Sequence, residues 1–143
     1  MGYCMNQRDA KFRIVAANKV KALNAIKALA SQTDKGGGGS WSGGKCIEKN
    51  FSWVTTEEFS GATTLHDAMW AWRWEIDTTD DGDVTSIMFE GEKMGDDTIL
   101  LDAIAPFVEA GSYIEMQGED GELWRWAFDG SKLIEQNARI SWQ

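Results

Sequence analysis

Few residues in this chain have the types and spacing that chemistry needs, beginning with one histidine and two cysteines. His66 is the only histidine, and Cys4 and Cys46 lie far apart in the sequence. A structural zinc site takes four Cys or His ligands at short spacings, and two cysteines are too few for a disulfide framework. We therefore expect two reduced thiols and no metal site. A Ser-His-Asp or Cys-His catalyst would depend on His66, in the first turn of a predicted helix.

Two glycine-containing segments approach known ligand-binding loops, but each lacks a required residue. Residues 39–46 resemble a phosphate-binding loop, yet Cys46 replaces the hydroxyl that holds magnesium. That segment also follows a helix and precedes a strand, the reverse of the required order. Residues 77–83 resemble half of a calcium loop, but Met88 stands where a bidentate glutamate is needed. We expect a flexible loop and a hairpin turn, with weak calcium binding at the turn as the alternative.

Paired carboxylates are the remaining catalytic possibility, because glycoside hydrolysis uses two of them. Candidates are Glu90, Glu92, Asp96, Glu115 and Glu119. Nothing in the sequence marks one of these as a buried general acid. Without a nucleophile–base pair, a metal cluster or a phosphate loop, we expect that the protein is not an enzyme and uses no cofactor.

Charge is unevenly distributed along the 143 residues, whose net charge is -9. Residues 1–49 carry nine Lys and Arg against three acids, whereas residues 50–143 carry five against twenty. The two parts therefore have net charges of +6 and -15. Such a difference indicates a two-faced surface or mutual neutralisation within the fold. The acidic excess argues against direct nucleic-acid binding, which needs a positive surface.

The acids gather at two turns that follow predicted strands. They are Glu90, Glu92, Asp96 and Asp97 at one turn, and Glu119, Asp120 and Glu122 at the other. If the strands that end in Gly91 and Gly118 lie side by side, the clusters form one negative edge. We expect a small acidic module that covers a basic surface of a protein partner. No apolar run approaches the roughly 20 residues of a membrane span, so we expect a cytoplasmic protein without a membrane partner.

Tryptophan is unusually frequent, with eight residues. The hydrophobic pattern places Trp53, Trp72, Trp124 and Trp126 on core faces. Trp41, in the glycine-rich segment, and Trp70, off the main stripe of its helix, are candidates for exposure, and an exposed indole can stack on a sugar. The alternative function is therefore a glycan- or small-ligand-binding module that uses Trp41, Trp70 and nearby acids.

Hydrophobic periodicity predicts three helices and a larger number of strands. Helices are expected at 19–31, from 65 to 72, and from 97 to 107, where Pro106 should shorten the last turn. Strands are expected at 11–15, 50–54, near 74–76 and 87–89, at 113–117, 123–128 and 132–135, with 138–142 closing the chain. We expect one α+β domain over 1–143, with a flexible Gly-rich loop at 35–45. Its single mixed or antiparallel sheet carries three helices on one face, in the order βαβαββαβββ.

Three motifs resemble those of small uncharacterised proteins of bacteria and their phages. They are the start Met1-Gly2-Tyr3, the run GEDG-x-x-WRW-x-F over 118–128, and the closing Ile140-Ser141-Trp142. The resemblance implies no activity and no site residues. It implies a gene of a phage or mobile element, and by analogy an inhibitor of host defence.

Overall fold

The computed structural model describes the backbone of residues 2–42, 45–139 and 141–142, and their side chains outside residues 38–49. The described helices are α1 (Lys19–Ala28), α2 (Thr56–Ser60), α3 (Leu65–Ala71) and α4 (Asp97–Ile104). The described strands are β1 (Met5–Lys11), β2 (Gly38–Ser42), β3 (Lys45–Asn50), β4 (Trp74–Thr78), β5 (Val84–Phe89), β6 (Tyr113–Gly118), β7 (Leu123–Phe128) and β8 (Leu133–Asn137). Single 3-10 turns join some of them. The α+β class is confirmed.

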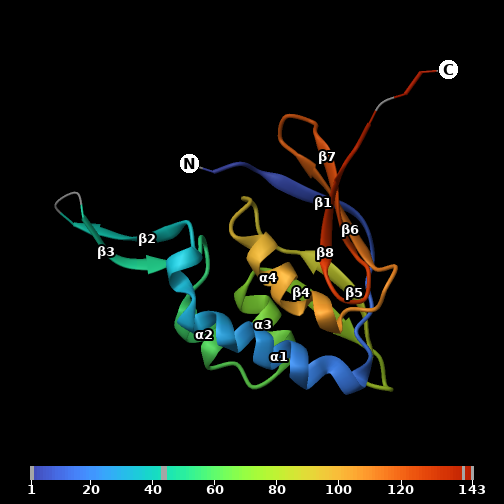
Figure 1. The fold of residues 1–143 in the computed structure, drawn as a ribbon, viewed down its shortest axis with the longest axis horizontal. Helices are drawn as coiled ribbons and strands as arrows, with labels where there is room; N and C mark the ends of the chain where they lie inside the picture. Colours follow the sequence, from blue (N-terminus) through green and yellow to red (C-terminus); the bar gives the residue numbers. More distant parts are fainter. Residues whose placement is uncertain (1, 43–44, 140, 143) are drawn as a thin grey trace.

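Three antiparallel sheets replace the single sheet that the sequence predicted. Strands β1, β6, β7 and β8 form a four-stranded sheet in the order β1-β6-β7-β8, while β2–β3 and β4–β5 are separate pairs. Figure 1 shows β2–β3 projecting from the body, on the side away from β7 and β8. The expectation of three helices on one face of one sheet is therefore wrong, and so is the order βαβαββαβββ. The described order is βαββααββαβββ.

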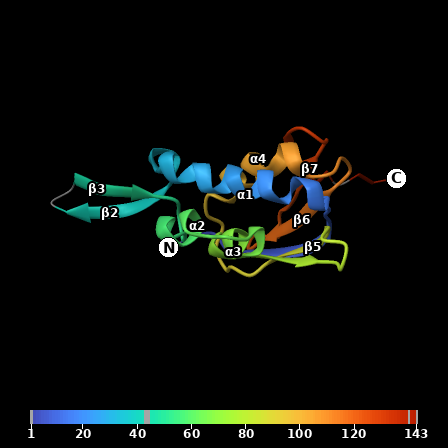
Figure 2. The same cartoon turned by 90° about the horizontal axis from the view of Figure 1, so that it is seen from below.

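The longer helices begin and end where local chemistry places them. Helix α3 begins after Thr64, whose Oγ1 accepts a hydrogen bond of 3.1 Å from Asp67 N. Helix α4 ends at Ile104, and Pro106 lies in the 3-10 turn that follows, so the shortened last turn is confirmed. Figure 2 shows α1 and α4 side by side, with β5 and β6 on one side of them.

The segment between α1 and α3 differs most from the prediction. Residues 35–45, expected to be a loop without a regular element, contain strand β2, which pairs with β3. The strand expected at 50–54 is not continuous, because Trp53 has a φ of 64°, in the left-handed region. The short helix α2 follows, with Glu57 and Glu58 in its first turn, where acids favour the positive helix end.

The core joins the four-stranded sheet to the β4–β5 pair through aromatic side chains. Trp74 of β4 and Trp126 of β7 lie edge to face, with ring centroids 6.2 Å apart. Trp124 meets Trp126 in the same manner at 5.9 Å. The described buried hydrophobic side chains form one cluster, which includes Trp72. The expectation that Trp72, Trp124 and Trp126 pack in the core is therefore confirmed.

Strand β1 also runs antiparallel to β5, and the two strands are joined by backbone hydrogen bonds at both ends. At one end, Ile14 N donates to Val84 O at 3.1 Å, and Val84 N donates to Ile14 O at 2.8 Å. At the other end, Met5 N donates to Glu92 O at 3.1 Å. The two sheets therefore meet along a seam between β1 and β5.

In the middle of the seam, the side chain of Gln7 takes the place of a backbone group. Its Nε2 donates to Ile87 O at 2.9 Å, and its Oε1 accepts from Phe89 N at 2.9 Å. The register of β1 against β6 shifts between Gln7 and Asp9, which marks a bulge. Because a bulge bends its strand, the backbones of β1 and β5 separate here, and a carboxamide can satisfy β5 across the gap.

Asp83 forms hydrogen bonds at the Ile14–Val84 end of the seam, and these bonds make the stability of the protein depend on pH. Its carboxylate accepts hydrogen bonds from Ala16 N at 2.8 Å and Arg13 Nη2 at 2.6 Å. The bond from the Ala16 backbone, followed by that from Arg13, holds the pKa of Asp83 below its ordinary value. The folded state thus gains stability from this carboxylate above about pH 4, and loses it as the pH falls through the lowered pKa.

We expect Asp83→Asn to lower the urea midpoint at pH 7 and to flatten the decline of stability as the pH falls below about 4. Urea denaturation at a series of pH values measures both effects. Asp80→Asn, in the exposed part of the same turn, is the matched control and should reproduce the wild-type profile. Parallel profiles for wild type and Asp83→Asn would contradict the assignment.

Candidate functional site

The start of the chain lies between the two acidic turns. On one side, Met94 N donates to Tyr3 O at 2.7 Å. On the other side, Glu119 N donates to Cys4 O at 2.9 Å, and the Glu119 carboxylate accepts from Cys4 N at 2.7 Å. The strands that end in Gly91 and Gly118 are therefore not neighbours, because the start of β1 lies between them. Both turns nevertheless flank one segment of backbone.

Five of the seven predicted acids are exposed at this place, and we call them the acidic edge. They are Glu90, Glu92, Glu119, Asp120 and Glu122. The side chain of Glu92 keeps 82% of its surface exposed. Adjacent strands are about 4.8 Å apart, so the two turns are separated by roughly 10 Å across the intervening segment. At this separation, which is about one Debye length at 0.1 M salt, the carboxylates of the two turns add to the same negative electrostatic potential.

Tyr3 and Lys93 lie among these acids, and the sequence analysis assigned neither to the site. Tyr3 Oη accepts a hydrogen bond from Asp120 N at 3.3 Å. The pKa of Tyr3 is raised, first by a hydrogen bond to Glu122 and then by desolvation, with smaller contributions from the charges of Glu122 and Asp120. The motif Met1-Gly2-Tyr3 was the available sequence signal, and it carried no chemical assignment.

Lys93 is the cation of this region. Its Nζ lies 3.0 Å from Cys4 Sγ and 3.9 Å from Glu92 Oε1. The hydrogen bond to Cys4 is the largest cause that raises the pKa of Lys93, and the charges of Glu92 and Glu119 add to it. Among the described residues, the ammonium of Lys93 is outnumbered by the five exposed carboxylates of the acidic edge.

Asp97 does not belong to the acidic edge, which corrects its prediction as a partner-binding residue. It is 1% exposed. Both carboxylate oxygens lie 3.0 Å from Arg73 Nη2, and one accepts from Trp74 Nε1 at 3.0 Å. The other accepts from Gly95 N at 2.9 Å. A carboxylate at the start of α4 is buried here because its charge and lone pairs are matched.

Asp96 is half-buried and contributes to the fold. Its Oδ2 accepts from Gly37 N at 2.8 Å and from Ser52 N at 2.7 Å. These donors stand before β2 and after β3. Asp96 thus anchors the base of the projecting hairpin, and its part in partner binding stays a prediction.

Gly95 lies against two residues, Trp53 and Arg73, whose φ angles are in the left-handed region. Arg73 has a φ of 73° and Trp53 a φ of 64°. A Cβ at Gly95 would lie 2.8 Å from Arg73 Nη2 and 2.9 Å from Trp53 Cδ1. The closeness of these two side chains requires glycine here. Backbone strain at Arg73 positions its guanidinium for Asp97.

One candidate ligand-stacking tryptophan is exposed, and the side chain of the other is not described. Trp70 lies on α3, with 52% of its surface exposed. The side chain of Trp41 lies outside the described residues. Trp53, predicted to face the core, is 55% exposed, which corrects that prediction. Its left-handed φ interrupts the alternation on which the prediction depended.

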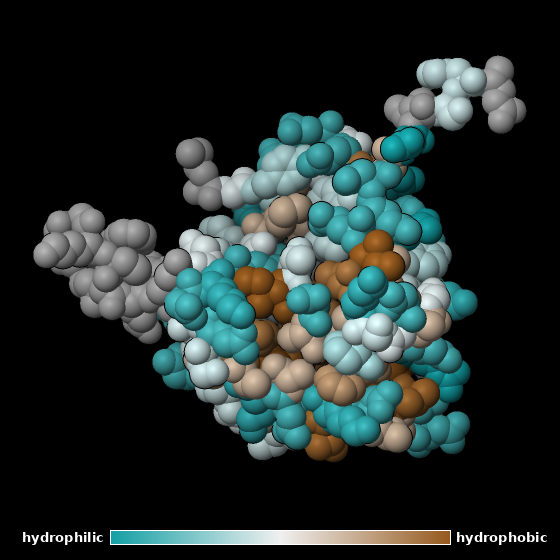
Figure 3. All heavy atoms as spheres, in the orientation of Figure 1, coloured by the Kyte–Doolittle hydropathy of each residue, from teal (hydrophilic) through white to brown (hydrophobic). Residues whose placement is uncertain are grey.

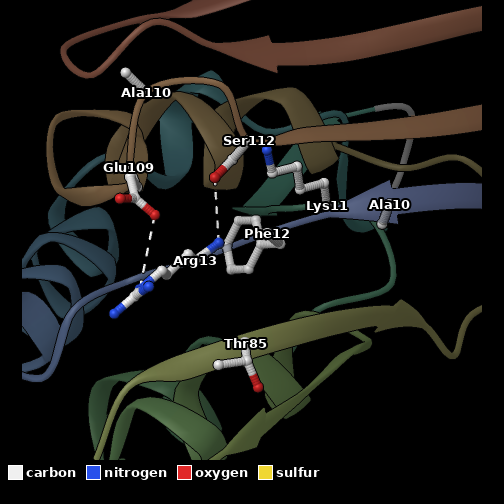
Figure 4. A pocket seen from close by; sticks show the side chains of 8 residues that line it. All are labelled: Ala10, Lys11, Phe12, Arg13, Thr85, Glu109, Ala110 and Ser112. Atoms are coloured by element: carbon white, nitrogen blue, oxygen red, sulfur yellow. Dashed lines mark hydrogen bonds and ion pairs between the residues drawn. The ribbon is translucent and has the colours of Figure 1, made fainter.

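A cleft of about 540 Å³ opens at the other end of the seam, and none of the sequence-predicted site residues lines it. Figure 4 shows Arg13 reaching toward Glu109, with Phe12 and Thr85 on the two sides of the gap between β1 and β5. Arg13 N donates to Ser112 Oγ at 3.2 Å, and Arg13 Nε lies 3.7 Å from Glu109 Oε2. The polar groups of the cleft are thus largely paired with one another.

Among the described residues, no group of three or more His, Cys, Asp and Glu side chains is arranged to hold a metal ion. Within the same part of the chain, every helix is too short or too polar to cross a membrane.

The ion pair of Asp97 and Arg73 is expected to stabilise the folded state, and a substitution can test this. Asp97→Asn keeps the shape of the side chain but leaves Arg73 buried without its counter-charge, so we expect a loss of about 3 kcal/mol in the free energy of unfolding. Urea denaturation measures this loss. Asp102→Asn, at an exposed position of the same helix, should change stability by less than about 0.5 kcal/mol. Equal effects of the two variants would refute the role of the pair.

Comparison with known proteins assigns no family: no protein-family model, no curated protein and no solved structure matches the chain. The resemblance of its motifs to small phage and bacterial proteins stays a prediction.

Proposed function

We propose that this protein is a small acidic binding module that covers a basic surface of a protein partner and catalyses no reaction. The observation that carries the proposal is the acidic edge, where two acidic turns flank the segment Tyr3–Met5. Its five carboxylates come from two turns far apart in the sequence. We further propose that the protein is cytoplasmic and that it inhibits host defence for a phage or mobile element.

The electrostatics of the acidic edge favour a cationic partner. Carboxylates gathered on one surface repel one another, which destabilises the free fold, and a basic partner removes that cost on binding. The raised pKa of Tyr3 fits such a negative field, although its hydrogen bond to Glu122 is the larger cause. Charge complementarity would mainly accelerate association.

The surface around these acids supports recognition by charge rather than by an apolar interface. Figure 3 shows hydrophilic side chains over much of one face, with apolar residues in separate patches among them. A partner that normally binds phosphate groups presents Lys and Arg to such a surface. If the carboxylates of the acidic edge bind these Lys and Arg side chains, the partner can no longer bind nucleic acid. This is the form of inhibition we propose.

Charge reversal with a matched control tests the proposal. The edge variant is Glu92→Lys, Asp120→Lys and Glu122→Lys. The control variant is Asp80→Lys, Asp81→Lys and Glu135→Lys, three exposed acids elsewhere. Both variants have the same net charge. The three proteins are first shown to be folded by circular dichroism, and then used to capture partners from host lysate at low and at high salt.

We expect the control to retain the wild-type partner and the edge variant to lose it. For the purified partner, the association rate of the edge variant should fall at least about tenfold at low salt, and wild type should approach that rate as salt is added. If the edge variant binds the partner as fast and as tightly as the control, the acidic edge is solvated surface and the proposal fails.

A glycan- or small-ligand-binding module is the second candidate, and the half-exposed indole of Trp70 favours it. A sugar stacked on this ring should raise the melting temperature of the protein by several degrees at saturation. A thermal-shift panel of glycans measures this effect. Trp70→Ala should abolish the shift, and Met88→Ala, at another half-exposed apolar residue, should retain it. A shift unaffected by Trp70→Ala would exclude this site.

A further inference from the structure

Cys4 and Lys93 form a contact that the proposed function does not use. Sγ and Nζ are 3.0 Å apart, and both side chains are partly buried. The two residues are opposite each other in an antiparallel bridge. Backbone hydrogen bonds from Met5 N to Glu92 O and from Met94 N to Tyr3 O bracket the bridge. Directly opposed residues present their side chains on the same face, so the backbone itself holds the sulfur against the amine.

We propose that Cys4 and Lys93 are an oxidation site, at which a peroxide converts the contact into a covalent sulfur–nitrogen link. In the first step, the sulfur of Cys4 attacks one oxygen of hydrogen peroxide. An S–O bond forms, the O–O bond breaks, and the products are a sulfenic acid and water. In the second step, the neutral amine of Lys93 attacks the sulfur. The S–N bond forms, the S–O bond breaks, and the departing hydroxide leaves as water with a proton from nitrogen.

The second step requires a neutral amine, which the charges of Glu92 and Glu119 disfavour and which oxidation of Cys4 makes more accessible. The hydrogen bond to Cys4 is the largest cause that raises the pKa of Lys93. Oxidation of the sulfur removes this cause, so the first step itself favours loss of the ammonium proton. The proton can leave to water, because the side chain of Lys93 is partly exposed.

The link would join the start of β1 to the segment that follows β5. It would close the long stretch of chain between residues 4 and 93, and cross-links of long loops stabilise proteins the most. It would also remove the positive charge of Lys93 from the acidic edge. The chemistry does not depend on the proposed function, because it needs no partner.

Peroxide titration of the full chain tests the proposal, in a Cys46→Ser background that leaves Cys4 as the single thiol. We expect an intact mass about 2 Da below the reduced protein, and a digest in which the peptide of Cys4 is joined to that of Lys93. The melting temperature should rise by about 5–10 °C, and dithiothreitol should reverse both changes.

Lys93→Arg is the matched control, because it keeps the positive charge but its guanidinium is a poor nucleophile at neutral pH. In this variant we expect oxidation products about 16 or 32 Da heavier and no link. If the Cys46→Ser protein with Lys93 intact also gains only oxygen and no linked peptide, the proposal is wrong. A link from Cys4 to a different lysine would overturn it too.

Discussion

The buried ion pair between Asp97 and Arg73 is the interaction on which the other elements depend. It fixes the first residue of α4 against the turn between α3 and β4, and Trp74 Nε1 joins it from the first residue of β4. The neighbouring Asp96 holds the base of the hairpin β2–β3 through Gly37 N and Ser52 N. Two consecutive acids therefore position α4, β4 and the hairpin. A buried charge is costly when unpaired, so these elements must assemble together.

Strand β1 connects the four-stranded sheet to the β4–β5 pair, and the acidic edge is a consequence of this connection. The strand pairs with β6 along its length, but with β5 only through its ends and the side chain of Gln7. At its start, the acidic turns attach on both sides. The position of the acids thus depends on an N-terminal segment that itself carries no acid before Asp9.

Local patterns predicted the elements whose chemistry is local. The effect of Pro106 is an example, and so is the hydrophobic pattern that buries Trp124 and Trp126. Prediction failed where a distant partner decides the outcome. Aspartate is usually a surface residue, and nothing near Asp97 in the sequence indicates otherwise. Asp97 is buried because Arg73, which is distant in the sequence, pairs with its charge. The seam between β1 and β5 could not be predicted either, because no pattern in β1 indicates that the Gln7 side chain will replace a backbone hydrogen-bond partner of β5.

The charge asymmetry of the sequence allowed either neutralisation within the fold or a two-faced surface. The ion pairs show neutralisation in some parts of the fold and exposed acids in another. Arg8 and Arg13, from the basic part of the chain, lie near Glu115, Asp83 and Glu109. Those acids line the sheet and the far end of the seam. Among the described residues, the ion pair at the acidic edge comes from Lys93, which belongs to the acidic part. The basic part of the chain thus neutralises acids away from the acidic edge, whose five carboxylates stay exposed beside the start of β1.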